Sequence, residues 1–149
     1  MINNHLIIDA MAMQQVKARY DEAEKNNNTE GMEAARKSYQ ALSQRIENRG
    51  AGYAKVYRLY EEAVERGNEH IDLNEVIWDK DVESLIQLLR ENGVEYFTFS
   101  STWSSAVEIA WLFTQNGCTL EGLVEINSPN KNTFTGEREK AHGYLFAIH

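Results

Sequence analysis

The chain has 149 residues and a formal net charge of −8 at pH 7, and 42% of its residues are apolar, with a single proline. This composition is typical of a folded, helix-rich chain and excludes a disordered one. Its length predicts one domain over residues 1–149, divided into a helical subregion (1–67) and an α/β subregion (68–149). One cysteine, Cys118, cannot form an internal disulfide, and no apolar run could span a bilayer. We therefore expect a soluble cytoplasmic protein without membrane association.

The charge is divided unevenly between the two subregions. Residues 1–67 hold ten Lys/Arg and ten Asp/Glu, whereas residues 68–149 hold five against thirteen. Binding to a phosphate backbone depends on clustered cations, so direct nucleic-acid binding is disfavoured. A basic protein partner suits the acidic half better.

The first predicted helix runs from about Asn4 to Lys25, because apolar residues recur there at intervals of three and four. Three asparagines, residues 26–28, then break the helical pattern. Thr29 is expected to cap the next helix, which begins near Glu30 with acidic residues in its first turn.

The second helical segment carries a hydrophobic seam with a period of 3.5 residues, which is typical of helices that pack side by side. Glycines at Gly50 and Gly52 leave two interpretations open: one helix as far as Arg66, or two helices with a break between them. Either interpretation predicts a helical hairpin. Nine of the ten seam positions are apolar or aromatic: Met32, Ala35, Tyr39, Leu42, Ile46, Arg49, Tyr53, Val56, Tyr60 and Ala63.

The second half alternates between helical and strand patterns after an acidic connector (69–78). Trp103, Val107, Ala110 and Trp111 have the spacing of a helical face. We expect an α+β fold with a small three-stranded mixed sheet, in which a parallel strand-helix-strand crossover precedes an antiparallel closing strand. The expected elements are a helix capped by Asp79 and stopped at Asn92-Gly93, a strand at 94–100, a helix at 103–115, a strand at 119–127, a polar loop at 127–136 and a strand at 141–149.

A serine-rich turn between the second-half strand and helix is the candidate ligand-binding site. Its hydroxyls and free backbone N–H groups could hold a phosphate or carboxylate, together with polar groups of the 127–135 loop. The glycines and lysine of a phosphate-binding loop are absent. A capping cluster, with Ser105 and Glu108 as a capping box, is the alternative interpretation. The candidate ligand-binding residues are Ser100, Ser101, Thr102, Ser104 and Ser105.

No catalytic residue, metal ligand or cofactor is predicted. An acidic run resembles the start of a calcium loop, but Ser84 and Arg90 stand where glycine and glutamate are required, so we interpret it as a solvated face. Neither Cys118 nor any of the four histidines has the spacing of a zinc site. The histidines are His5, His70, His142 and His149. The acidic run consists of Glu69, Asp72, Glu75, Asp79, Asp81 and Glu83.

Four tyrosines of the helical segment, Tyr39, Tyr53, Tyr57 and Tyr60, are candidate interface residues. Tyrosine combines a large apolar ring with a polar tip and is enriched at interfaces. The alternative is that these rings pack within the chain, against the first helix.

The segments FTFSSTWSSAVEIAWLF (97–113), GCTLEGLVEIN (117–127) and GYLFAIH (143–149) resemble small uncharacterised proteins of Gram-positive gut bacteria and their mobile elements. The resemblance covers only the C-terminal part of the chain, and it implies a cytoplasmic accessory protein without a diagnostic catalytic motif.

The leading hypothesis from the sequence is a non-enzymatic interaction module, which self-associates, as a homodimer for example, or binds a protein partner through the helical hairpin. One alternative is an acidic inhibitor of a nucleic-acid-binding protein, which rests on the charge of the second half. Another is a small-molecule or nucleotide binder that uses the Ser100–Ser105 turn.

Overall fold

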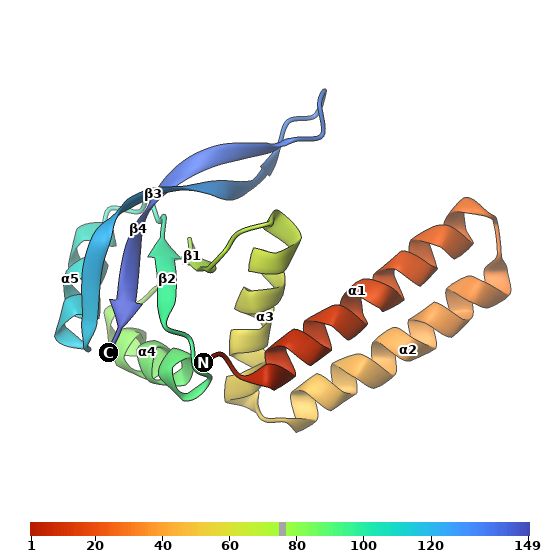
Figure 1. The fold of residues 1–149 in the computed structure, drawn as a ribbon, viewed down its shortest axis with the longest axis horizontal. Helices are drawn as coiled ribbons and strands as arrows, with labels where there is room; N and C mark the ends of the chain where they lie inside the picture. Colours follow the sequence, from red (N-terminus) through yellow and green to blue (C-terminus); the bar gives the residue numbers. More distant parts are fainter. Residues whose placement is uncertain (75–76) are drawn as a thin grey trace. The chain divides into compact units, whose positions relative to one another are not determined.

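The computed structural model describes residues 1–74 and 77–149 and confirms the predicted α+β class (Figure 1). Glu75, which belongs to the predicted acidic run, lies outside the described residues. The elements in chain order are α1 (Asn4–Lys25), α2 (Thr29–Asn48), α3 (Ala51–Arg66), β1 (Ile71–Leu73), the short 3-10 helix η1 (Asp79–Asp81), α4 (Val82–Glu91), β2 (Tyr96–Phe99), α5 (Ala106–Gln115), β3 (Cys118–Lys131) and β4 (Arg138–Ile148).

The chain divides into two compact units. The helical unit comprises Asn3–Tyr57, and the sheet unit comprises Arg58–His149 together with Met1–Ile2. The division falls inside α3, whereas the sequence placed its subregion boundary after residue 67. The helical unit contains eight Lys/Arg and seven Asp/Glu, and the sheet unit contains seven Lys/Arg and sixteen Asp/Glu. The sheet unit therefore carries all of the net negative charge.

Helices α1 and α2 form the hairpin that the sequence predicts, and α1 has the predicted bounds. The helix cap was assigned to the wrong residue, because Asn28, not Thr29, caps α2. The Asn28 side-chain oxygen accepts a hydrogen bond from the Gly31 N–H at 3.0 Å, and Thr29 is already helical. Asn27 adopts a φ of 53°, a left-handed conformation that asparagine tolerates well. The polar turn thus both reverses the chain and starts α2.

The seam is interrupted at Gly50, so the interpretation with two helices is the correct one. Gly50 has a φ of 120°, a conformation that favours glycine, and it separates α2 from α3. The apolar phase nevertheless continues across the break, since Leu42 and Ile46 before it and Tyr53 and Val56 after it are all buried.

A buried carboxylate joins the three helical segments of this unit. Asp9 of α1 is fully buried, and its oxygens accept hydrogen bonds from Arg45 (2.8 Å), from Arg49 (2.9 and 3.2 Å) and from the Tyr53 hydroxyl (2.6 Å). Burial on its own would raise the pKa of Asp9, but the bonds from Arg49, Tyr53 and Arg45 outweigh it and hold the pKa below its ordinary value. Arg49 is the one polar position of the predicted seam, and this ion pair explains its presence there.

The sheet has four strands in the order β1-β2-β4-β3, one more than the three predicted. The additional strand, β1, lies in the segment interpreted as an acidic connector, and its three residues are too few to show an alternating pattern. It pairs in parallel with β2, and β4 runs antiparallel to both of its neighbours, β2 and β3. Strands β2 and β3 are therefore parallel, as predicted, but β4 lies between them.

Helix α5 covers one face of the sheet through an aromatic core. The Phe113 ring of α5 lies 5.0, 5.1 and 5.3 Å from the rings of Phe97, Phe99 and Phe146, measured between centroids. The helix forms, but the side that carries Trp103, Val107 and Trp111 is exposed, whereas Ile109 and Phe113 are buried. Helix α4 lies beside α5 and buries Val82, Leu85, Ile86 and Leu89.

The predicted start of α4 and the predicted loop after β3 both differ from the structure. Asp79 begins η1, and α4 starts three residues later, at Val82. Half of the predicted 127–136 loop is strand, since β3 extends to Lys131, and β4 begins only at Arg138. Pro129 is tolerated there because it lies in an edge strand, at the register shift between Asn127 and Lys131 that interrupts the regular β3–β4 ladder. Within the described residues, none of the helices has the length and apolar character that crossing a membrane requires.

Candidate functional site

The Ser100–Ser105 turn follows the carboxyl end of β2, and some of its hydroxyls already have partners. The Ser100 hydroxyl donates to Asp72 Oδ2 at 2.7 Å, and Ser101 Oγ accepts from the Trp103 N–H at 3.3 Å. Thr102 and Ser104 are exposed. Ser105 occupies the N-cap position of α5, but within the described part of the chain its side chain makes no capping hydrogen bond, so the predicted capping box does not form.

Asp72, which the sequence assigned to a solvated acidic face, is buried in β1 with 5% of its surface exposed. Its second oxygen accepts a hydrogen bond from the Thr98 hydroxyl at 2.6 Å, across the parallel pair of strands. Burial raises the pKa of Asp72, and this effect exceeds the opposing effects of the Ser100 and Thr98 bonds and of the Arg66 charge. Parallel pairing with β2 explains the error, because it carries the middle residue of β1 into the interior.

The raised pKa of Asp72 predicts that Asp72→Asn will not destabilise the chain at pH 7. The folded state binds the Asp72 proton more tightly than the unfolded state, so stability falls as pH rises from 3.8 through the folded-state pKa. An amide avoids this loss and can still accept the Thr98 bond. We expect thermal unfolding, followed by tryptophan fluorescence, to show an equal or higher midpoint at pH 7. This difference from wild type should vanish at low pH.

Asp79→Asn, at an exposed carboxylate, is the matched control for this experiment and should change the midpoint little at pH 7. A markedly lower midpoint for Asp72→Asn at pH 7 would contradict the prediction. It would mean that the ionised carboxylate gains more from Arg66 and the hydroxyls than burial costs it.

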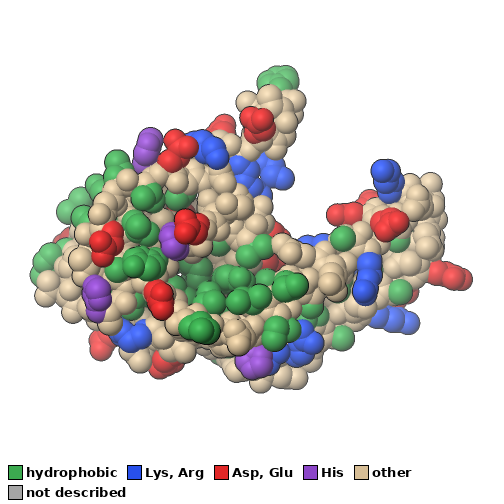
Figure 2. Space-filling model, viewed as in Figure 1, with side chains coloured by type: hydrophobic (Ala, Val, Ile, Leu, Met, Phe, Trp, Pro, Cys, Tyr) green, Lys and Arg blue, Asp and Glu red, His purple; other side chains and the backbone are tan. Residues whose placement is uncertain are grey.

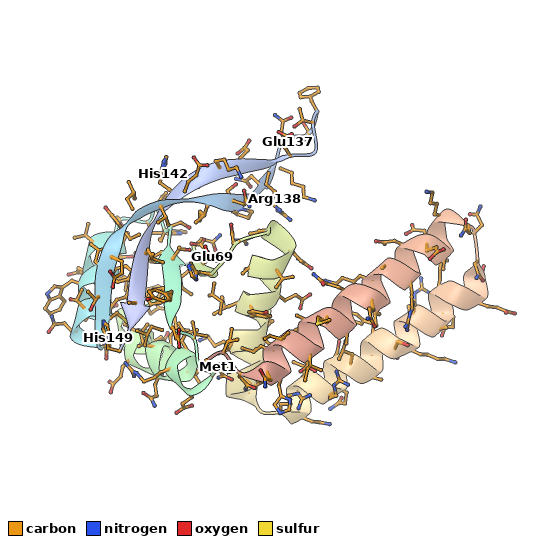
Figure 3. The ribbon with its side chains drawn as sticks, in the orientation of Figure 1. Met1, Glu69, Glu137, Arg138, His142 and His149 are labelled. Carbon is orange, nitrogen blue, oxygen red and sulfur yellow. The ribbon has the colours of Figure 1, made fainter. Side chains whose placement is uncertain are left out.

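A pocket of about 240 Å³, here called the sheet pocket, lies over the sheet on the face that carries Thr98. Thr98, Val124 and Leu145 line it from three strands, and polar residues of β4 and of the segment after α3 also line it; Glu69 of this segment is labelled in Figure 3. The Asn68 side chain exchanges two hydrogen bonds with the Asn127 backbone, at 2.8 and 3.0 Å. These bonds hold the end of α3 to β3. The polar lining residues of β4 and of the segment after α3 are Asn68, Glu69, His70 and Lys140.

Cys118 is a free and buried cysteine. Burial raises the pKa of Cys118 to about 11, so the thiol stays protonated at neutral pH and is a poor nucleophile. His149 contacts the Thr119 hydroxyl at 2.8 Å, and His142 lies elsewhere on β4 (Figure 3). In residues 1–74 and 77–149, no three His, Cys, Asp or Glu side chains are grouped so that they could hold a metal ion.

The four candidate interface tyrosines differ in exposure. Tyr53 and Tyr57 are buried and stack with a centroid separation of 6.3 Å, and Tyr60 is half-buried. Tyr39 is 48% exposed. Of the four, Tyr39 therefore presents the most accessible ring to a partner.

Tyr39 lines a groove of about 350 Å³ between α1 and α2, here called the hairpin groove. Val16 and Tyr20 contribute from α1, and Ala35 contributes from α2. The Arg36 guanidinium lies 5.7 Å from the centre of the Tyr20 ring, which fixes one wall of the groove. The sequence indicated Tyr39 but not the groove, because the α1 residues that complete it are distant in the chain.

The fold therefore combines a two-helix hairpin, formed by α1 and α2, with a four-stranded mixed sheet and the helices α4 and α5. Residues 55–148 match a domain of unknown function, DUF7698. Because the match covers more than half of the chain, the chain belongs to this family. No curated protein and no solved structure matches the chain.

Proposed function

We propose that the chain is a non-enzymatic interaction module that self-associates through the hairpin groove. The observation that carries the proposal is an apolar groove, with an accessible tyrosine at Tyr39, on a unit whose charges nearly balance. Two copies of such a unit meet without strong repulsion. Paired two-helix hairpins also make a four-helix bundle, in which each hairpin covers the face that its partner leaves open.

The charges along the hairpin groove support a second copy of the chain as its partner. Lys17 and Asp21 lie one helical turn apart on α1, at the edge of the groove. If two α1 helices meet antiparallel across a twofold axis near Arg19, Lys17 of one copy faces Asp21 of the other. A twofold interface requires this kind of self-complementary surface.

The test is the mass of the full chain in solution, measured by light scattering at tens of micromolar. The wild-type chain should have the mass of a dimer. Tyr39→Glu should weaken dimerisation by about 30-fold or more, because it places a carboxylate in the apolar contact. Tyr39 is exposed, so the single chain should keep its helical circular dichroism and its melting temperature.

Ala41→Glu is the matched control, since Ala41 is exposed on α2 and does not line the groove. It should leave the dimer intact. A wild-type chain that remains monomeric at these concentrations would exclude the proposal. Dimerisation that Tyr39→Glu does not weaken would place the interface elsewhere.

A second candidate function is an acidic inhibitor that binds a basic nucleic-acid-binding protein. It is supported by the sheet unit, where sixteen Asp/Glu stand against seven Lys/Arg. An inhibitor of this kind must bind a basic segment of its target, so titration of the chain with an arginine-rich peptide is its first test.

A further inference from the structure

All three tryptophans of the chain are exposed, although the sheet unit that contains them has an aromatic core. Trp78, Trp103 and Trp111 are exposed by 63%, 58% and 60%, whereas Phe97 and Phe113 are fully buried. Tryptophan is highly buried on average, and exposed tryptophans are enriched at the energetic centres of protein interfaces. Their exposure therefore needs an explanation outside the core.

The tryptophans lie on one part of the sheet unit. Val107 and Trp111 are four residues apart and lie along one side of α5, and Trp103 lies in the turn that leads into this helix. Trp78 immediately precedes η1, and η1 contacts α5. Hydrophobic side chains gather over α5 and the adjacent strand β3 at the left of Figure 2. We call Trp78, Trp103, Val107 and Trp111 the tryptophan surface.

The tryptophan surface has the size of a functional patch and not of a complete interface. At these exposures the three indoles present on the order of 400 Å² of apolar area, in the range of the largest patch on a typical monomer. A stable complex buries about 800 Å² on each partner. The remaining contact must come from the polar groups that surround the indoles.

Most of those surrounding groups are acidic, although Lys80 lies between Asp79 and Asp81. Asp79, Asp81 and Glu83 follow Trp78 in the chain, and Glu108 follows Val107 on α5. None of these four carboxylates forms an ion pair with any residue in the described ranges 1–74 and 77–149. A partner with cationic side chains would therefore meet carboxylates that have not been neutralised within the chain.

The charge also limits which partner can bind. A second copy of the same surface would bring two acidic units together, and anionic lipid would be repelled for the same reason. Arginine suits both parts of the surface, because its guanidinium stacks on an indole face and pairs with a carboxylate through a planar fork. Lysine offers a point charge and stacks less well.

We propose that the tryptophan surface binds an arginine-rich segment of a partner protein, with guanidinium groups on the indoles and on the carboxylates beside them. The surface lies in the sheet unit and is separate from the hairpin groove. A chain that fails to dimerise can therefore still bind such a segment, and a dimeric chain can fail to bind it.

A peptide titration followed by tryptophan fluorescence tests this inference directly, because every tryptophan of the chain belongs to the surface. The probe is a synthetic peptide with the repeat Arg-Ala-Leu-Ala, and matched peptides carry lysine or glutamate in place of arginine. At about 150 mM salt, where long-range attraction is screened, the arginine peptide should bind and the glutamate peptide should not. The lysine peptide should bind at least about threefold more weakly than the arginine peptide.

Variants locate the binding and separate it from dimerisation. Trp111→Ala should weaken binding of the arginine peptide by about tenfold or more. Phe134→Ala removes a side chain that is 97% exposed in the turn between β3 and β4, and it should leave binding unchanged. The titration is repeated in the Tyr39→Glu chain, where a monomer should bind with the same affinity.

Three results would overturn the inference. The first is that the arginine peptide does not bind, and the second is that the arginine and lysine peptides bind equally well and Trp111→Ala has no effect. The third is a tryptophan emission that shifts with protein concentration alone in the Tyr39→Glu chain, which would show that a second copy covers the surface.

Discussion

Replacing Asp9 with alanine should cost the helical unit about 3 kcal/mol of unfolding free energy. Removing the carboxylate leaves two arginines facing each other and leaves the buried Tyr53 hydroxyl without its 2.6 Å acceptor. Losses from breaking a buried pair range up to about 5 kcal/mol, but Arg45 is 48% exposed and can recover water. The measurement is urea unfolding followed by far-UV circular dichroism, which reports chiefly on the helices.

Glu47→Ala provides the control for Asp9, because Glu47 is an exposed acidic residue on α2. It should change stability by no more than about 0.5 kcal/mol. In the double variant Asp9→Ala/Arg49→Ala, the loss of unfolding free energy should be smaller than the sum of the two single losses. The reason is that each single variant already breaks the same ion pair. A loss below about 1 kcal/mol for Asp9→Ala would show that the cluster does not hold the three segments together.

The contribution of Asp9 should also depend on pH, in the direction opposite to that of Asp72. Its folded-state pKa lies below the ordinary value of 3.8, so the stabilisation is complete above that pH and is lost as pH falls through the folded-state pKa. The difference between wild type and Asp9→Ala should therefore shrink only below pH 3.8. Asp9 stabilises the fold as a carboxylate, whereas Asp72 is accommodated best when it is protonated.

Local chemistry accounts for the parts of the fold that the sequence predicted well. Helix α1 has the predicted bounds because its apolar spacing and the asparagines after it depend on neighbouring residues alone. The break at Gly50 was one of two open interpretations. Glycine permits a positive φ but does not require one, so the sequence could not decide between them.

Contacts between distant residues account for what the sequence missed. Strand β1 is defined by its pairing with β2, and the same pairing buries Asp72. A signal for the Asp9 cluster did exist, because Arg49 is the one polar member of the seam and Asp9 lies among apolar residues of the first helix. The exposure of Trp103 and Trp111 had no comparable signal, since Ile109 and Phe113 share the helix and compete for its buried side.

Replacing Phe113 with alanine should destabilise the sheet unit by about 3–5 kcal/mol. The Phe113 side chain is fully buried, and its ring contacts those of Phe97, Phe99 and Phe146. Its removal therefore loses both transfer free energy and edge-to-face ring contacts, and it leaves a cavity. Tryptophan fluorescence during urea unfolding is the measurement, because all three tryptophans lie in this unit.

Trp111→Ala is the control on the same helix, two residues away and 60% exposed. It deletes a larger ring, yet it should cost no more than about 1 kcal/mol, since most of that ring is already in water. Equal losses for the two variants would mean that Trp111 belongs to the core, and the tryptophan surface would lose its basis. A large loss at Phe113 with a small loss at Trp111 would instead separate the residue that holds α5 on the sheet from the residue that α5 presents to a partner.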